Sequence, residues 1–526
     1  MKIMNILNKY NIIIIFLIIL MCAIIFSFQV KKEGFHEDEA YSLVSSVNAN
    51  NGLMTAYKNN DFPENESPEW KTKEYVKNFA TLSSENYLNF VSVYNNQCMD
   101  NHPPVFYIFA HISSILFGGQ FTKYSIFLVN IIAFILSCIV INKILKDLNK
   151  NEISIPILIL YGLSMGTISM VLFQRMYMLL TLFVLLYFYY TIKIYKNNFI
   201  LNRNIIIKLG VIAILGFLTQ YFFAIYAVGI FLVMIVKMKK ENKIICLKKY
   251  ILIHIIYSAI GILLFPYCIY HLFFTSRGIS NLNNSNYFTN LVTYIKYLTY
   301  SFTVKESTLV LFIGLVLIFI RLMRMHKEDN EKFIILLIII PSLIFFLITI
   351  KLTSFQELRY ILPMIPFIVI AIFFILDKLI DIKYKNIIFI GISITLVLHG
   401  FISSSPQYLY ENYKECINIA KENSEKSFVY IYDNFFNHMQ SIPEMMIYNK
   451  TLIINNNKNE LEYLIKDEQL NKENSYILCI KSYMNNDEIL ERIKNETEFN
   501  NIIALYTNDY GHNNEQVENN LYLVSK

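Results

Sequence analysis

Residues 11–28, NIIIIFLIILMCAIIFSF, form an unbroken apolar run, and the polar stretch GFHEDEAYSLVSS follows at residues 34–46. About 17–25 apolar residues are enough to cross the hydrocarbon core of a bilayer as a helix. The run is too long for the apolar region of a signal peptide and lacks a small-residue cleavage site, so we predict a retained membrane helix. Three carboxylates and a histidine therefore lie close to a membrane anchor, where such charges are either solvated or functional.

The rest of the chain repeats the apolar pattern. Of its 526 residues, 55% are hydrophobic and only 16% are charged, and the mean hydropathy is +0.42, which excludes an ordinary soluble globular protein. The seven cysteines lack metal-ligand spacing, so neither a disulfide framework nor a zinc site is predicted. We predict eleven membrane spans, at about residues 10–29, 122–142, 153–173, 176–192, 204–219, 220–236, 250–272, 307–320, 333–350, 360–376 and 387–402.

Basic residues indicate the orientation of these spans. Alternate loops carry lysine clusters, such as Lys143, Lys146 and Lys150, whereas the opposite short loops are nearly free of basic residues. Short cytoplasmic loops are enriched in Lys and Arg. The pattern predicts a plasma-membrane protein with a cytoplasmic N-terminus, and it places the first loop, residues 30–121, and the tail, residues 403–526, outside the cytoplasm.

The tail has the composition of a separate domain. Strand-like runs alternate with polar helical runs, which predicts a small α/β domain over residues 403–526 beside a transmembrane domain over residues 1–402. No glycine-rich phosphate loop occurs, so neither a nucleotide nor a nucleic acid is expected as a partner. The strand-like runs are SFVYIYDNF, TLIINN, SYILCIKS, NIIALYTN and NLYLVSK.

A second polar cluster lies in the first loop, where residues 98–119 read CMDNHPPVFYIFAHISSILFGG. Apolar residues from Val105 follow helical spacing, but the helix is too short to cross a bilayer, so we predict an interfacial helix. Asp100, Asn101 and His102 would then lie at the height of the membrane surface. A solvated acidic pair or a simple helix start explains either cluster alone, whereas two clusters on one loop favour a functional site.

Arginine is used sparingly, in only seven of the 46 basic residues. Three of the seven, Arg175, Arg277 and Arg359, lie at or near predicted outer ends of spans, against the charge trend. The planar guanidinium binds phosphate oxygens in pairs. The alternatives are contacts with lipid head groups or, for Arg359, an ion pair with Glu357.

Four motifs, taken in order, resemble the GT-C superfamily of membrane glycosyltransferases. The similarity is to the family-39 type, which includes protein O-mannosyltransferases and aminoarabinose transferases. The motifs are DEAYS at 38–42, DNHPPVFYIFAHISSILFGG at 100–119, RMYMLL at 175–180 and RYILPMIP at 359–366. The resemblance covers about residues 1–402 and implies a polytopic α-helical fold and a polyprenyl-phosphate-linked sugar donor, presented at the outer leaflet. The tail resembles the extracytoplasmic appendages of some bacterial members.

The residues in these motifs suggest an inverting transfer. A carboxylate can take the proton of an attacking hydroxyl as an oxocarbenium-like state forms. We expect Asp38 to be this base, assisted by Glu39, with Asp100 and His102 positioning hydroxyl groups. Two arginines would neutralise the leaving phosphate. The predicted catalytic residues are Asp38, Glu39 and Asp100, and the predicted substrate-binding residues are His102, Arg175, Tyr177, Arg359 and Tyr360.

Other interpretations remain open from the sequence. No cofactor is expected if arginines bind the phosphate, although Glu37, Asp38 and Asp100 could hold a divalent cation. A transporter or flippase of lipid-linked sugars predicts ionisable residues at mid-membrane, and the predicted spans carry almost none. A polysaccharide polymerase or ligase would use the same donors. The partners are therefore membrane lipids, the lipid-linked donor, and a glycan, lipid or protein acceptor.

Overall fold

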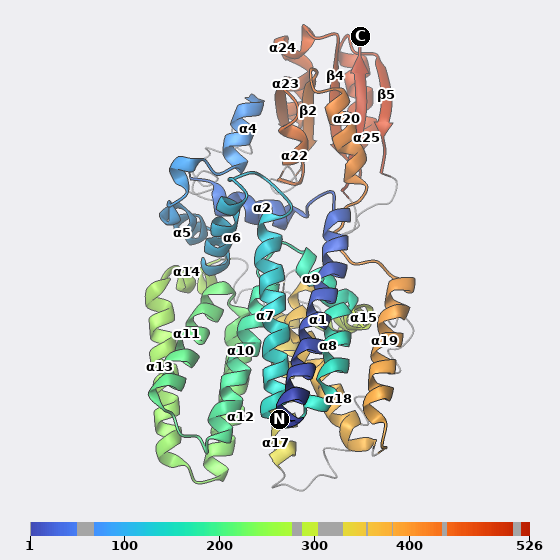
Figure 1. The fold of residues 1–526 in the computed structure, drawn as a ribbon. Helices are drawn as coiled ribbons and strands as arrows, with labels where there is room; N and C mark the ends of the chain where they lie inside the picture. The colour runs from blue at the N-terminus through green and yellow to red at the C-terminus, as the bar shows by residue number, and fades with distance from the viewer. Residues whose placement is uncertain are drawn as a thin grey trace.

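The computed structural model shows a helical bundle below a separate sheet domain, with short helices between them (Figure 1). The N-terminus lies at the lower end of the bundle and the C-terminus lies in the sheet domain. The structure describes residues 2–49, 68–275, 287–302, 330–353, 356–380, 382–433, 439–508 and 517–526.

Eight helices of the described chain are long and apolar enough to cross a membrane. The fold is therefore that of a multi-pass helical membrane protein. The eight are α1 (Lys2–Lys31), α7 (Ser125–Asp147), α10 (Tyr177–Lys196), α12 (Phe222–Lys240), α13 (Ile244–Leu264), α17 (Asn330–Leu352), α18 (Ile365–Leu379) and α19 (Lys385–Ser403).

The other predicted spans differ from regular membrane helices. The span at 153–173 is a pair of helices, α8 (Ser154–Leu163) and α9 (Met165–Leu172), bent by 55°. The span at 204–219 is α11 (Arg203–Thr219), which is 17 residues long. The span predicted at 307–320 lies outside the described residues, as does Arg277.

One predicted span was wrong in its extent. Residues 250–272 are not one helix, because α13 ends at Leu264 and a short helix, α14 (Tyr267–Phe273), begins after Pro266. Proline lacks the backbone N–H that a continuing helix needs, and its ring clashes with the preceding turn. The break leaves α14 beside the outer-loop helices (Figure 1).

Close packing fixes the centre of the bundle. Helix α10 packs against α7, α11 and α12, and α12 also packs along α17. Gly229 of α12 allows this approach, since a Cβ there would lie 2.8 Å from the Cα of Pro341 in α17. The residues around α10 are thereby held as one rigid support for the turn that precedes it.

The first outer loop forms α2 (Glu37–Val47), α4 (Lys73–Ala80), α5 (Phe90–Met99) and α6 (Val105–Leu116). Helix α6 turns its polar face inward: His111 and Ser113 are buried and bonded to backbone carbonyls of Ser46 and Ser125. Of its apolar residues, Phe109, Ile112 and Leu116 are exposed, whereas Val105, Phe106 and Ala110 are buried. The helix is 12 residues long, and its interfacial position stays a prediction.

The tail folds as the predicted α/β unit, with a six-stranded sheet in the order β1-β3-β2-β4-β6-β5. Strand β2 is parallel to β3 and β4, and the other pairs are antiparallel. The strands are β1 (Glu69–Thr72), β2 (Ser427–Tyr432), β3 (Lys450–Asn455), β4 (Ser475–Lys481), β5 (Asn501–Tyr506) and β6 (Asn519–Ser525). The helices are α20 (Tyr413–Glu422), α22 (Ile442–Met445), α23 (Lys458–Lys466), α24 (Glu468–Asn471) and α25 (Asn486–Glu496). Strand β1 comes from the first outer loop, so the loop and the tail share one sheet.

Candidate active site

The first turn of α2 presents the acidic cluster. His36 is the N-cap: its Nδ1 accepts a hydrogen bond from the backbone N–H of Asp38 at 3.0 Å, and the Glu39 carboxylate accepts from the His36 N–H at 2.7 Å. This reciprocal pattern is a capping box with histidine in the usual place of Ser or Thr. Burial and the charge of Arg359 together lower the pKa of His36 to about 3. His36 is therefore neutral and free to accept the hydrogen bond.

Two arginines converge on the carboxylate of Asp38. Nη2 of Arg359 lies 2.9 Å from Oδ2 of Asp38, and Nη2 of Arg175 lies 3.9 Å from Oδ1. Arg175 comes from the turn between α9 and α10, and Arg359 comes from the 3₁₀ helix η4 (Leu358–Tyr360). Both arginine side chains are almost fully buried, whereas 26% of the Asp38 side chain is exposed. Asp38 is therefore the accessible member of the cluster.

The network continues to Asp100. Nη2 of Arg175 donates to Nε2 of His102 at 3.2 Å, and Nδ1 of His102 lies 2.9 Å from Oδ2 of Asp100. A guanidinium can only donate, so Nε2 of His102 accepts and its Nδ1–H donates to Asp100. The two carboxylates expected to converge, Asp38 and Asp100, thus belong to one network that passes through Arg175.

Both of these carboxylates are held in the ionised form. Burial alone would raise the pKa of Asp38, but the charges of Arg359 and Arg175 outweigh burial and hold that pKa well below its usual range. Burial also opposes ionisation of Asp100, but its partner His102 and the charge of Arg175 bring the pKa of Asp100 below its ordinary value. The site therefore carries two fixed negative and two fixed positive charges at neutral pH.

Aromatic rings surround the arginines. The guanidinium of Arg359 lies 5.4 Å from the ring centre of Phe173 and 5.3 Å from that of Tyr360. Tyr177 stacks on Phe173 and meets Tyr360 edge-on, with ring centres 5.9 Å apart. Tyr177 and Tyr360 therefore lie beside the network and frame one side of it.

Glu39 lies apart from the network. Its side chain is fully buried, where Oε2 pairs with Nζ of Lys32 at 2.9 Å and Oε1 accepts from the backbone N–H of Gln174 at 2.7 Å. Burial raises the pKa of Glu39, although the charge of Lys32 opposes the shift. Because Gln174 directly precedes Arg175, Glu39 fixes the backbone from which that arginine extends. Glu39 is thus placed to position the site and not to contact a substrate.

Several contacting residues were not among the predicted site residues. Nη1 of Arg175 donates to Oγ of Ser42 at 2.5 Å and to the hydroxyl of Tyr107 at 3.2 Å. Ser42 is four residues after Asp38, one helical turn away, and that spacing was a usable signal. Tyr107 lies within the motif at 100–119, which was its only signal, because its immediate neighbours Phe106 and Ile108 are apolar.

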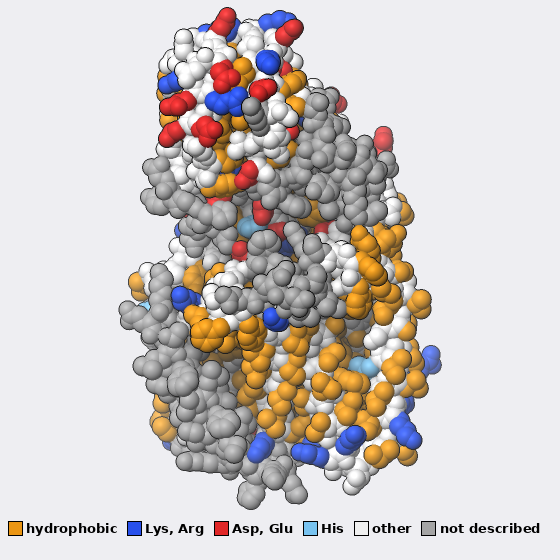
Figure 2. Space-filling view, turned by 180° about the vertical axis from the view of Figure 1, so that it is seen from behind, with side chains coloured by type: hydrophobic (Ala, Val, Ile, Leu, Met, Phe, Trp, Pro, Cys, Tyr) orange, Lys and Arg blue, Asp and Glu red, His pale blue; other side chains and the backbone are white. Residues whose placement is uncertain are grey.

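Figure 2 shows acidic, basic and histidine side chains gathered in a recess between the sheet domain and the membrane helices. Within the described residues, no three His, Cys, Asp or Glu side chains are placed to share a metal ion. Asp38 faces two arginines, which repel cations. The arrangement of Glu37, Asp38 and Asp100 does not fit a divalent cation.

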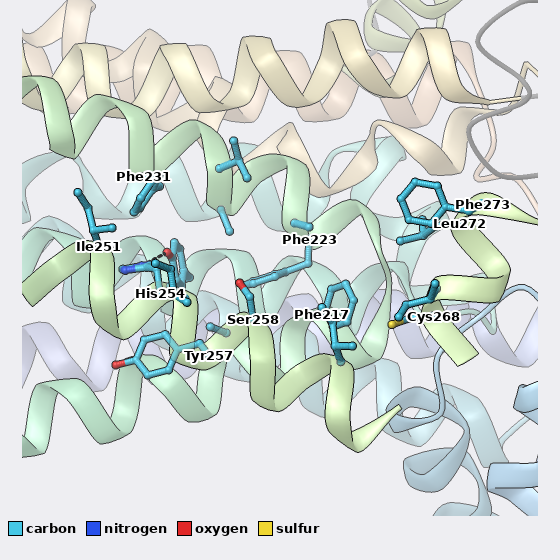
Figure 3. A pocket seen from close by; sticks show the side chains of 18 residues that line it. Phe217, Phe223, Phe231, Ile251, His254, Tyr257, Ser258, Cys268, Leu272 and Phe273 are labelled. Carbon is cyan, nitrogen blue, oxygen red and sulfur yellow. Dashed lines mark hydrogen bonds between the residues drawn. The ribbon is translucent and has the colours of Figure 1, made fainter. Parts of the chain in front are cut away.

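A separate apolar cavity of about 560 Å³ lies among α11, α12, α13 and α14 (Figure 3). Phe217, Phe231 and Cys268 are among its lining residues. Its polar wall is His254, whose Nε2 lies 2.7 Å from the hydroxyl of Tyr187. At the outer end, Nε2 of His271 in α14 bonds to the carbonyl oxygen of Cys98. The cavity therefore borders α14, which is bonded to the end of α5 just before Asp100.

Residues 101–270 match the family model described as dolichyl-phosphate-mannose-protein mannosyltransferase. No curated protein sequence matches the chain.

Two crystal structures of ArnT from Cupriavidus metallidurans resemble the chain over nearly its whole length. The structure bound to undecaprenyl phosphate gives a TM-score of 0.55 at 10% identity, covering 98% of each chain. The apo structure gives 0.52 at 10% identity, covering 96% of this chain and 97% of that chain. The chain therefore has the fold of these membrane proteins, as its resemblance to the GT-C superfamily implied, and about a third of it matches a glycosyltransferase family model.

Proposed function

We propose that the protein transfers a hexose or pentose from a polyprenyl-phosphate donor to an acceptor hydroxyl at the outer face of the membrane, with inversion. The observation that carries this proposal is the network in which Asp38 and Asp100 are joined through Arg175 and Arg359 pairs with Asp38. The ArnT structure bound to undecaprenyl phosphate supports the donor class. The lysine-rich loops support the orientation, with the N-terminus in the cytoplasm and the tail outside.

The arginines suit a leaving phosphate. Nε of Arg175 is buried and has no hydrogen-bond partner among the described residues, and the buried Nη1 of Arg359 makes no hydrogen bond there but lies 3.7 Å from Oε2 of Glu357, the ion pair considered for this arginine. Buried donors without partners are costly, so these atoms point to a ligand that supplies acceptor oxygens. As the bond from the sugar to the phosphate oxygen breaks, negative charge grows on the phosphate, and fixed guanidinium groups stabilise it.

The carboxylates and their neighbours carry the acceptor chemistry. Asp38 takes the proton of the attacking hydroxyl, while Asp100 and His102 orient hydroxyls of the acceptor or the sugar. Glu39 keeps Arg175 in place through the Gln174 backbone. Tyr177 and Tyr360 frame the sugar-phosphate beside Arg359.

The apolar cavity provides a place for the donor hydrocarbon. Its walls are almost entirely apolar, and it borders α14, which is bonded to the end of α5 just before Asp100. An isoprenoid chain in the cavity would exchange its contacts with membrane lipids for packing against these apolar walls. The head group would then lie at the level of the ionic network.

The test is sugar transfer by Asp38→Asn in membranes supplied with undecaprenyl-phosphate-linked sugars. Loss of a positioned base costs about 10²–10⁴-fold in rate, so kcat should fall by that range. Near-normal transfer would remove Asp38 as the base. Mass analysis of envelope glycans in a deletion strain identifies the sugar and the acceptor, and it separates a transferase from a polymerase or ligase. Unchanged glycans with impaired flipping of lipid-linked sugars would favour a flippase.

A further inference from the structure

One edge of the sheet domain faces the outer-loop helices. The C-terminus lies at the far end of this domain, away from those helices (Figure 1). Strand β6 ends one residue before the C-terminus, and β4 runs antiparallel to β6. Strand β2 is parallel to β4. The carboxyl ends of β2 and β4 therefore point towards the outer loop.

The gap between β2 and β4 is a topological switch point. After β2 the chain passes to β3 on one side, and after β4 it passes through α25 to β5 at the opposite edge of the sheet. The segments that follow these two neighbouring parallel strands therefore diverge. In open α/β sheets, ligands bind in the crevice that such divergence leaves at the carboxyl ends of the strands.

Two exposed side chains lie at this switch point. Asp433 directly follows β2, and Tyr483 is the second residue after β4. The hydroxyl of Tyr483 donates to Oδ1 of Asp433 at 2.8 Å, so the pair joins the two strand ends. The Tyr483 side chain is 39% exposed. An aromatic face beside a carboxylate can pack against the C–H groups of a sugar ring and accept hydrogen bonds from its hydroxyls.

Hydrogen bonds connect this edge of the sheet to the ionic site. Nζ of Lys481, the last residue of β4, donates to Oε1 of Gln440 at 2.9 Å. Nε2 of Gln440 in turn donates to the carbonyl oxygen of Phe35 at 3.0 Å. Phe35 is three residues before Asp38, so the end of β4 is held against the start of α2.

The charges at this edge favour a neutral ligand. Partial burial raises the pKa of Tyr483, and Asp433, Glu518 and Glu37 raise it further, which shows that three carboxylates act on its hydroxyl. The ammonium of Lys481 is buried and bonded to neutral amide groups. Carboxylates repel a phosphorylated lipid head group, whereas a neutral chain of sugars meets no such repulsion.

We propose that Tyr483 and Asp433 bind a glycan acceptor at the switch point of the sheet and direct its reacting hydroxyl towards Asp38. The inference rests on the proposed function and names the acceptor class for it. The ring of Tyr483 packs on one sugar of the acceptor, and Asp433 accepts hydrogen bonds from its hydroxyls. A neighbouring sugar of the same chain then reaches the ionic network. The sheet domain thereby selects the acceptor, while the helical bundle binds the donor.

The first experiment measures binding without catalysis, by saturation-transfer NMR on the full-length protein in lipid nanodiscs. The probe is the glycan fraction released from the envelope of the deletion strain. Saturation should pass to the glycan C–H protons in the wild type and in Tyr483→Phe, which keeps the ring, and should be lost in Tyr483→Ala. Tyr463→Ala, at an exposed tyrosine on α23, is the matched control and should bind like the wild type. Equal transfer in Tyr483→Ala contradicts the proposal, as does no transfer in the wild type.

The second experiment follows sugar transfer from undecaprenyl-phosphate mannose, with 4-amino-4-deoxyarabinose on the same lipid as the alternative donor. The glycan, lipid and protein fractions of the deletion-strain envelope are offered separately, and the label should enter the glycan fraction. Tyr483→Ala and Asp433→Asn should raise the KM for this glycan about tenfold, the usual loss for a truncated contact residue. The donor KM, and kcat at saturating glycan, should be those of the wild type. A general disturbance of the sheet domain would lower kcat as well, because Gln440 supports the loop before α2.

The outcomes separate the two proposals. Label only in the lipid or the protein fraction would overturn the glycan assignment and leave the transferase intact. An unchanged glycan KM in Tyr483→Ala would overturn the role of the strand ends. No label in any fraction from either donor would contradict the proposed function, and the NMR experiment would still decide whether Tyr483 binds a glycan.

Discussion

At the scale of single residues, the site is an alternation of charges in which each arginine has more than one partner. Arg175 bonds to Ser42, Tyr107 and His102 while facing Asp38, so its position is fixed before any substrate binds. Arg359 is held between aromatic rings. Fixed donors need little rearrangement when charge develops on a leaving group, which is the physical basis of electrostatic catalysis. Stabilising the leaving group therefore requires the fixed position of each guanidinium group as well as its positive charge.

Replacing Arg359 with lysine separates these two requirements. Lysine keeps the charge but loses the planar fork and the aromatic stacking. We expect Arg359→Lys to lower kcat/KM by about 10²–10³-fold, the usual loss for one preorganised donor. Steady-state transfer kinetics with a lipid-phosphate sugar measure the effect.

The matched control for this substitution is Arg492→Lys. Arg492 lies on α25 of the sheet domain, where it pairs with Glu496 four residues later. That pair is exposed and contributes little, so the kinetics should be those of the wild type. Equal kinetics for Arg359→Lys would show that charge alone is enough at this position.

The sequence predicted which residues gather at the site but not how each acts. Asp38 and Glu39 are adjacent acids, and nothing in the amino-acid sequence distinguishes their roles. In α2 their side chains point about 100° apart, so one meets the arginines and the other is buried against Lys32. Which side faces the site depends on how α2 packs, and that is a tertiary property.

At the scale of elements, hydropathy located the helices and missed their breaks. The apolar run through residues 250–272 continues across Pro266, but α13 ends before this proline and α14 begins after it. The break matters because α14 closes the outer end of the apolar cavity and carries His271, which bonds to Cys98. A window of hydropathy cannot detect such a turn, but the proline was a usable signal.

The cavity gives a prediction for these elements. Ala227 of α12 lines it, so Ala227→Trp should fill part of the space and exclude a hydrocarbon chain. We expect the KM of the long-chain donor to rise about tenfold or more, because losing the contact of even a small part of the donor hydrocarbon with an apolar pocket costs about 1–3 kcal/mol of binding free energy. Transfer from a short-chain lipid-phosphate sugar should be retained.

Ala259→Trp on α13 is the control for this change. Ala259 is exposed on the outer side of the bundle and is not among the cavity residues. The same enlargement there should leave the KM of both donors unchanged. A normal KM for the long-chain donor in Ala227→Trp would place the hydrocarbon elsewhere on the protein.

At the scale of the whole molecule, the sheet domain and the first loop are one structure. Strand β1 pairs with β3 from Glu69↔Ile453 to Thr72↔Lys450, and the indole of Trp70 donates to Asp467. The five tail strands were predictable from their alternating apolar residues. Strand β1 was not, because four residues with two charges show no strand pattern until the partner edge is present.

The position of the sheet domain at one end of the helical bundle determines which end of the molecule faces each side of the membrane. Lys and Arg side chains gather at the end of the bundle opposite the sheet domain (Figure 2). The positive-inside rule predicts that this end lies in the cytoplasm and that the proposed site faces outward. Lys466 on α23 and Lys240 at the end of α12 are exposed and lie at opposite ends. We expect a cysteine at Lys466 to react with a membrane-impermeant maleimide on intact cells, and a cysteine at Lys240 to react only after permeabilisation.

The natural cysteines do not interfere with this labelling test once the two half-buried ones are replaced. Five of the seven are buried, and only Cys22 and Cys246 are half-buried, so Lys466→Cys and Lys240→Cys are made in a background with alanine at both of those positions. Sugar transfer by the alanine background shows that the fold is intact. The reverse labelling pattern would put the ionic site on the cytoplasmic side, where a donor presented at the outer leaflet could not reach Asp38. Orientation and chemistry are therefore tied together, because the recess that holds the charges opens on the same side as the sheet domain.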